Sequence, residues 1–157
     1  MLIKYNGISQ DVTLGDNPIA PTTWYCSQTD VPIHGFTLND GHACGKISIS
    51  ELTVHTSGSF TSSDILNFKL YYTTSSTFDS NTLLASINSP AATGTELFTG
   101  ISFEQPDNLG YYWITIDLAD DITSSTIKVD AINADDLTAN KVAIGSAVES
   151  GLQTITR

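Results

Sequence analysis

Large aromatic residues alternate with polar residues along two segments of the sequence. Tyr71 and Trp113 each fall on the face of their segment opposite the residues that the pattern assigns to the core. An aromatic ring on an outer sheet face can stack on the apolar face of a sugar, while flanking polar groups meet its hydroxyls. The sequence therefore predicts a glycan-binding surface that consists of Tyr71, Tyr111, Trp113, Thr73 and Thr115. Asp117 would add a carboxylate to this surface. The alternative is that Trp113 covers a sheet edge or packs under a loop, because tryptophan is rarely left open to water.

The histidine and serine pattern does not predict catalysis. A serine hydrolase needs a nucleophile on a strained turn, a histidine base and an acid, and the sequence contains no Gly-x-Ser-x-Gly. His34 and His42 flank a turn, and His55 follows Val54 on a predicted strand, where we expect a solvated side chain on the outer face. We therefore expect no catalytic residues and a protein that is not an enzyme.

The acidic residues gather in predicted turns rather than as a facing pair. One group is Asp117, Asp120 and Asp121, and the other is Asp130, Asp135 and Asp136. Glycoside hydrolysis needs two carboxylates at a fixed separation across a cleft, whereas loop carboxylates suit calcium, which takes about six to eight oxygen ligands. Because no EF-hand spacing is present, we expect solvated loop charges and no cofactor, with calcium binding as the alternative.

Cys26 and Cys44 are the only cysteines in the chain. A disulfide between them would stabilise the fold by about 3 kcal/mol in the chain-entropy model. The alternative is two buried free thiols. Their spacing fits no standard zinc site, so we expect the disulfide and no metal.

Hydrophobic residues recur with a period of two over most of the chain, which indicates β-strands. One predicted inward set is Leu66, Phe68, Leu70 and Tyr72, and another is Tyr112, Ile114, Ile116 and Leu118. Turn signals every 8–15 residues separate the runs, as at Asn39-Asp40-Gly41, and residues 77–84 are the one candidate for a helical turn. Such a pattern predicts an all-β fold, an antiparallel β-sandwich of immunoglobulin-like or jelly-roll type.

Length and charge limit the class of protein further. The 157 residues fit one domain, and we expect a single sandwich over residues 21–157 after an N-terminal extension or added hairpin at 1–20. Six Lys and Arg against 17 Asp and Glu give a net charge of −11, which argues against nucleic acid and anionic lipid as partners. No apolar run is long enough to span a membrane. Ser and Thr form about a quarter of the chain, as in secreted β domains.

Several segments resemble the N-terminal accessory domain associated with BNR-repeat sialidases, which occurs in secreted multidomain proteins of Bacteroidetes-type bacteria. They cover roughly residues 30–157: Asp64-Ile65, Lys69-Leu70-Tyr71-Tyr72-Thr73 continuing to Phe78, Tyr111-Tyr112-Trp113-Ile114-Thr115 continuing to Leu118, the stretch from Ser124 to Ala131, and Ile155-Thr156-Arg157. The two aromatic strands together are moderately specific. The resemblance implies a β-sandwich of this size with a noncatalytic, carbohydrate-binding role.

Two functions remain open from the sequence. We expect a carbohydrate-binding module of a larger secreted or bacterial cell-surface protein, with a glycan and the neighbouring domains of the same polypeptide as partners. The alternative is a structural or adhesive spacer domain of a bacterial surface protein. Because the start of the chain has no signal-peptide pattern, we expect an excised piece of a longer extracellular polypeptide.

Overall fold

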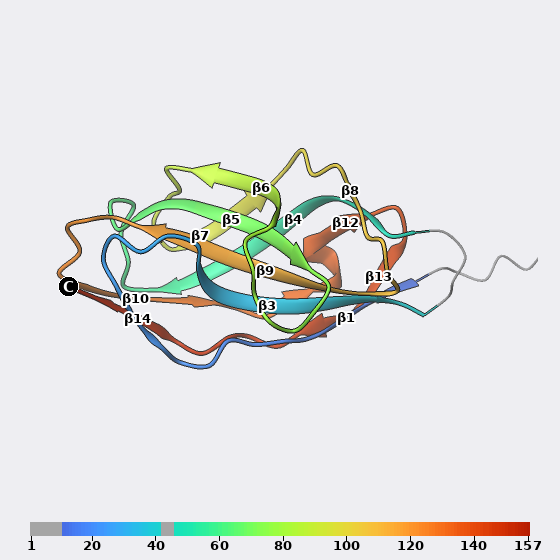
Figure 1. The fold of residues 1–157 in the computed structure, drawn as a ribbon, viewed down its shortest axis with the longest axis horizontal. Helices are drawn as coiled ribbons and strands as arrows, with labels where there is room; N and C mark the ends of the chain where they lie inside the picture. The colour runs from blue at the N-terminus through green and yellow to red at the C-terminus, as the bar shows by residue number, and fades with distance from the viewer. Residues whose placement is uncertain (1–10, 42–45) are drawn as a thin grey trace, which may run out of the picture.

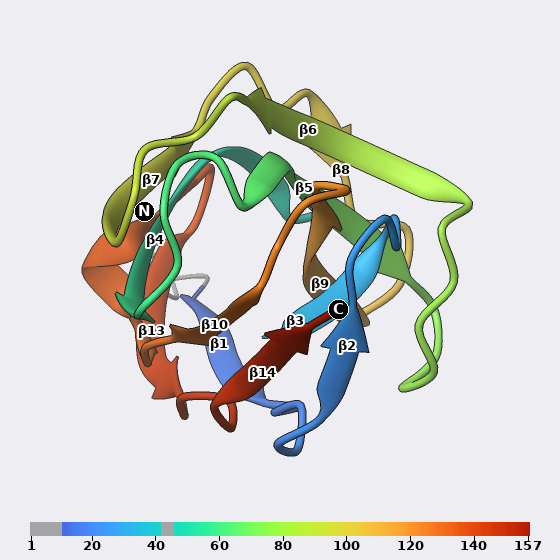
Figure 2. The same ribbon diagram turned by 90° about the vertical axis from the view of Figure 1, so that its left-hand side faces the viewer.

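Two β-sheets face each other across one hydrophobic core in the computed structural model, which describes residues 11–41 and 46–157. The first sheet has the order β11 (Ile132–Asn133), β13 (Val142–Ala147), β1 (Asp11–Asp16), β3 (Val31–Asp40), β9 (Leu109–Leu118), β5 (Ile65–Thr73) and β6 (Thr82–Asn88). The second has the order β12 (Leu137–Ala139), β4 (Ser48–Gly58), β10 (Ser124–Val129), β14 (Gln153–Thr156) and β2 (Thr23–Tyr25), and β7 (Gly94–Phe98) and β8 (Phe103–Glu104) also pair with β4. Figure 2 shows this arrangement along the long axis.

The predicted all-β sandwich is confirmed, with one refinement of the strand directions. Most neighbouring strands are antiparallel, but β1 pairs with β13 in parallel and β14 pairs with β2 in parallel. Both sheets are therefore mixed. The described residues contain one 3₁₀ turn, η1 (Ala134–Asp136), and no helix long and apolar enough to cross a membrane.

The core follows the period-two pattern, except where a bulge shifts it. All four residues of the predicted inward set on β9 are buried: Tyr112, Ile114, Ile116 and Leu118. On β5, Phe68, Leu70 and Tyr72 are buried, but Leu66 is 51% exposed and Ile65 takes its place in the core. The register between β5 and β9 shifts between Ile65 and Asn67. One extra residue there reverses the alternation, which is why the prediction for Leu66 was wrong.

The sandwich begins earlier than the sequence pattern indicated. Strand β1 lies between β3 and β13 in the first sheet, and its residues Val12 and Leu14 are buried in the core. Residues 11–16 therefore belong to the domain rather than to the predicted extension at 1–20. Residues 1–10 lie outside the described part of the chain.

The loop between β5 and β6 folds back over the outer face of the first sheet. In Figure 1 this loop, residues 74–81, passes in front of β9 and β3. It contains no helical turn, in contrast to the expectation for residues 77–84. Its position decides what the outer face of β3, β5 and β9 can bind.

Candidate functional site

Strands β5 and β9 bring their outward-facing residues together in cross-strand pairs. Asn67 lies opposite Asp117, Lys69 opposite Thr115, and Tyr71 opposite Trp113. Directly opposite residues on one face of an antiparallel pair are close enough to interact. The predicted binding residues and Asp117 therefore share one surface, which we call the outer face.

The two main aromatic residues of the outer face are covered rather than open. Tyr71 and Trp113 are each only 4% exposed. Phe78 from the β5–β6 loop packs against both, with ring centroids 5.5 Å from Tyr71 and 5.7 Å from Trp113. The sequence placed these residues on the correct face, but the expectation that they are exposed to a sugar was wrong, because the apolar Phe78 ring is buried more favourably against them than in water.

The predicted hydroxyl groups are also turned inward. Thr73 is buried, and its Oγ1 accepts a hydrogen bond from Trp113 Nε1 at 2.8 Å and donates one to the carbonyl of Ser75 at 2.7 Å. Thr115 is fully buried, and its Oγ1 has no hydrogen-bond partner in the described part of the chain. Only Tyr111 of the five predicted residues is half-buried. In this conformation, neither threonine offers a hydroxyl to a ligand.

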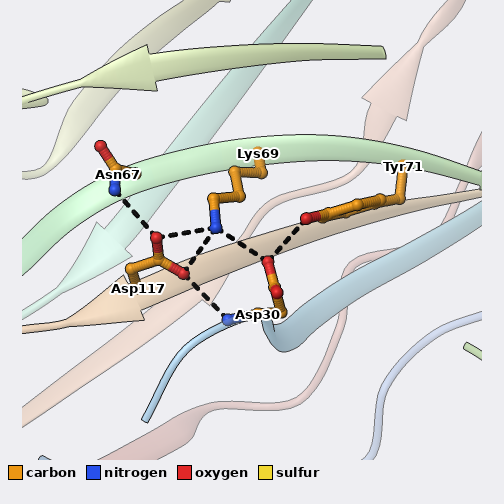
Figure 3. A network of polar contacts seen from close by, with 5 residues as sticks. All are labelled: Asp30, Asn67, Lys69, Tyr71 and Asp117. Atoms are coloured by element: carbon orange, nitrogen blue, oxygen red, sulfur yellow. Dashed lines mark hydrogen bonds and ion pairs between the residues drawn. The ribbon is translucent and has the colours of Figure 1, made fainter. Parts of the chain in front are cut away.

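A polar network continues the outer face beyond the aromatic residues (Figure 3). Lys69 Nζ lies 2.9 Å from Asp30 Oδ1 and 2.8 Å from Asp117 Oδ2. Tyr71 donates its hydroxyl hydrogen to Asp30 Oδ1 at 2.7 Å, and Asn67 donates to Asp117 Oδ2 at 2.8 Å. We call these five residues the Lys69 network. It joins β5 and β9 to the chain just before β3.

Asp30 is held in an uncommon backbone conformation. Its φ of 52° lies in the left-handed region, which Asp tolerates better than most residues. The Asp30 amide N–H donates to Asp117 Oδ1 at 2.9 Å. Its carboxylate and its backbone therefore both contact the Lys69 network, and these contacts offset the local strain.

The charges in the Lys69 network stabilise one another. Burial alone lowers the pKa of Lys69, but hydrogen bonds and charge from Asp117 and Asp30 outweigh it and raise the pKa above its usual value. Burial likewise raises the pKa of Asp117, but Lys69, the Asp30 amide and Asn67 together lower it below its usual value. Burial and the Asp30 carboxylate raise the pKa of Tyr71 to about 12. Lys69 and Asp117 are therefore an ion pair at neutral pH.

Sequence reasoning did not single out Asp30, Asn67 or Lys69 as site residues. The alternation along β5 contained the signal, because Asn67 and Lys69 share the face of Tyr71. Asp117 was grouped with turn acids, yet it is only 6% exposed and lies within strand β9, one residue before its end. Nothing in the sequence indicated Asp30, because this residue lies outside the strands, where hydrophobic alternation makes no prediction.

The other candidate groups do not assemble into a site. His55 is on the outer side of the second sheet as expected, but it contacts Asp136 Oδ1 at 3.0 Å through Nε2 and Thr95 Oγ1 at 3.3 Å through Nδ1. His34 is fully buried, and its Nδ1 lies 2.8 Å from Ser150 Oγ. Within residues 11–41 and 46–157, no three His, Cys, Asp or Glu side chains gather to hold a metal ion. Cys26 is half-buried, and its predicted disulfide partner Cys44 lies outside the described residues, as does His42.

An open groove lies on the second sheet, away from the outer face. Its volume is about 560 Å³, and serines from β4 and the loop before β8 line it together with Phe103 and Asn140. The Asn140 side chain is engaged with the backbone, because it accepts from the Ser48 amide at 2.8 Å and donates to the Lys46 carbonyl at 3.0 Å. The Asn140 amide group is therefore occupied by backbone contacts.

Comparisons with known proteins do not assign a family. No family model matches the chain, and no curated protein matches it. One similar solved chain comes from a structure described as manganese lipoxygenase of Gaeumannomyces graminis and partial zonadhesin of Komagataella pastoris. It is 16% identical with a TM-score of 0.23, and the alignment covers 83% of this chain but only 53% of that one. A likeness at that level supports no argument about function.

Proposed function

We propose that this domain is a structural spacer, one unit in a larger secreted or bacterial cell-surface polypeptide. The observation that supports it is where the chain enters and leaves the sandwich. Strand β1 begins beside the end of β3, where Val12 pairs with Asp40, and β14 ends beside the start of β10, where Thr156 pairs with Ser124. These two points lie at opposite ends of the long axis (Figure 1). Between them, β9 spans ten residues, or about 33 Å.

The outer face also fits a spacer better than an open binding surface. Phe78 covers Tyr71 and Trp113, and the Lys69 network ties β5 and β9 to the chain just before β3. A domain of this kind needs no cofactor, and its partners are the neighbouring domains of the same polypeptide. The net charge of −11 keeps it soluble and repels nucleic acid.

Carbohydrate binding is the second candidate, and the Phe78 contact is the observation that favours it. Phe78 is only half-buried and belongs to a loop whose other residues from 74 to 81 are exposed. Displacing this one ring would uncover Tyr71 and Trp113 beside the half-buried Tyr111. The two segments that resemble the sialidase-associated domain are the adjacent strands β5 and β9, so we also propose kinship with that domain.

A glycan array decides between the two candidates. The array would be probed with the wild-type protein, Phe78→Ala and Trp113→Ala, each with and without calcium. A melting curve would confirm that each variant is folded. The spacer proposal expects no specific binding, even when Phe78→Ala uncovers the rings. A sugar site on the outer face would bind with millimolar to micromolar affinity, roughly −4 to −8 kcal/mol, and lose that binding in folded Trp113→Ala. Binding that survives Trp113→Ala would also contradict the spacer and would move the site elsewhere, with the serine-lined groove tested next by Ser50→Arg.

A further inference from the structure

Lys69 on β5 faces a carboxyl group on the adjacent strand β9 at hydrogen-bonding distance. Its Nζ lies 2.8 Å from Oδ2 and 3.0 Å from Oδ1 of Asp117, so the nitrogen is placed against both oxygens. The Lys69 side chain is 18% exposed and that of Asp117 only 8%. From this geometry we propose that Lys69 and Asp117 become joined by an intramolecular isopeptide bond between Nζ and Cγ. This covalent modification does not depend on the spacer role.

The reaction balances without any further reactant. The Lys69 ammonium and the Asp117 carboxylate together contain all the atoms of one amide and one water. The Nζ–Cγ bond forms, one Cγ–O bond breaks, and the departing oxygen leaves with two of the three ammonium protons. Nothing is oxidised or reduced, so the folded chain can carry out the step alone.

Asp30 is placed to move the proton that this reaction requires. An ammonium is not a nucleophile, so Nζ must lose a proton before it attacks. Asp30 Oδ1 lies 2.9 Å from Nζ and can accept that proton, then return it to the departing oxygen. The Tyr71 hydroxyl, 2.7 Å from the same oxygen, and the left-handed backbone at Asp30 hold this carboxylate in position.

Two N–H groups are placed to stabilise the negative charge that develops on Asp117. The Asp30 amide donates to Oδ1 at 2.9 Å, and Asn67 Nδ2 donates to Oδ2 at 2.8 Å. Attack on Cγ turns the carboxyl group into a tetrahedral intermediate with an oxyanion, and fixed N–H donors stabilise such a species. Each Asp117 oxygen therefore already has the donor that the intermediate needs.

The residues around the pair limit the access of water to it. Thr115, directly opposite Lys69, is fully buried, and Tyr71 on the same strand is 4% exposed. Removing water raises the free energy of the ion pair relative to a neutral amine and a neutral acid. The neutral pair is the reactive one, whereas the hydrogen bonds and charges of the Lys69 network favour the ion pair, so Nζ must first pass a proton to Asp30 at 2.9 Å.

The test is the intact mass of the folded, reduced wild-type protein. We expect it to be lower than the sequence mass by one water, and proteolysis should release a branched peptide that joins Lys69 to Asp117. Lys69→Arg keeps the cation but supplies no amine, so its full sequence mass is expected. Asp30→Asn, which removes the proton acceptor while keeping the side-chain shape, should also retain the full mass. Lys128→Arg is the matched control on a half-buried surface lysine and should still lose one water.

Three results would overturn the proposal. The first is a folded wild-type protein with its full sequence mass. The second is a loss of one water that persists in Lys69→Arg, which would point to dehydration elsewhere, such as a succinimide at Asp40-Gly41. The third is a branched peptide that joins Lys69 to Asp30 instead of Asp117. A melting curve on each variant ensures that a full mass in Lys69→Arg or Asp30→Asn does not come from unfolding.

Discussion

Replacing Lys69 with methionine is expected to lower the free energy of unfolding by about 3 kcal/mol, the low end of the range for breaking a buried ion pair, because Asp117 is buried but Lys69 is half-buried. Methionine keeps much of the side-chain volume but leaves the Asp30 and Asp117 carboxylates facing each other without a cation. Where the amide joins Lys69 to Asp117, the loss comes from the missing cross-link instead of from the ion pair, because an amide between residues 48 apart closes a long loop in the unfolded chain, worth about 4 kcal/mol in the chain-entropy model. Guanidinium denaturation of the wild-type and variant proteins measures the difference.

Lys128→Met is the matched control for the Lys69 substitution. Lys128 contacts Glu149 at 2.7 Å on the surface, and the Glu149 side chain is 58% exposed. Surface pairs of this kind contribute about 0–1 kcal/mol, so the control should unfold at nearly the wild-type denaturant concentration. A loss below about 1 kcal/mol for Lys69→Met would mean that the Lys69 network does not stabilise the outer face.

Acid is expected to destabilise the protein through His34. Burial lowers the pKa of His34 from 6.5 to about 4, so the folded state binds its proton less readily than the unfolded state does. A group with a lowered folded pKa contributes stability that is complete above the unfolded pKa and is lost as the pH falls towards the folded value. The contribution of His34 to the free energy of unfolding should therefore fall by about 3 kcal/mol between about pH 7 and pH 4.

The variant His34→Phe isolates that contribution. Phenylalanine keeps an aromatic ring beside Phe36, whose centroid lies 6.3 Å from that of His34, but it does not titrate. The Asp117 carboxylate loses its own stabilising effect at lower pH, and this loss is common to both proteins. We expect the wild-type protein to lose about 3 kcal/mol of stability relative to the variant as the pH falls from 7 to about 4. Parallel stability curves over this range would show that His34 is not held neutral by burial.

The fold was predictable from the sequence because the alternation is strong on most strands. The pattern at Tyr112, Ile114, Ile116 and Leu118 gave the correct buried face of β9. It failed at Leu66, where the shift between β5 and β9 depends on pairing with a distant strand. The two parallel strand pairs, β1–β13 and β14–β2, could not be predicted either. Alternation along one strand does not show the direction of the neighbouring strand.

The site was predicted only in part, because the burial of its aromatic rings depends on a loop. Period-two alternation placed Tyr71 and Trp113 on one outer face. Their burial depends on Phe78, which the sequence presents as one apolar residue in a polar loop with no periodicity. Asp30 reaches Lys69 across 39 residues, and such a contact exists only after the sheet has formed.

The most direct test of the spacer claim is mechanical. The domain would be stretched in a single-molecule experiment, once with handles at the two ends of the chain and once with handles at residue 124 and the C-terminus. End-to-end load runs along β1 and β14 and stresses many ladder hydrogen bonds together, whereas the second geometry opens the β10–β14 ladder from its Ser124–Thr156 end, one bond after another. We predict a clearly higher unfolding force for the end-to-end geometry. An end-to-end force no greater than that of the second geometry would contradict a domain built to bear load along its axis.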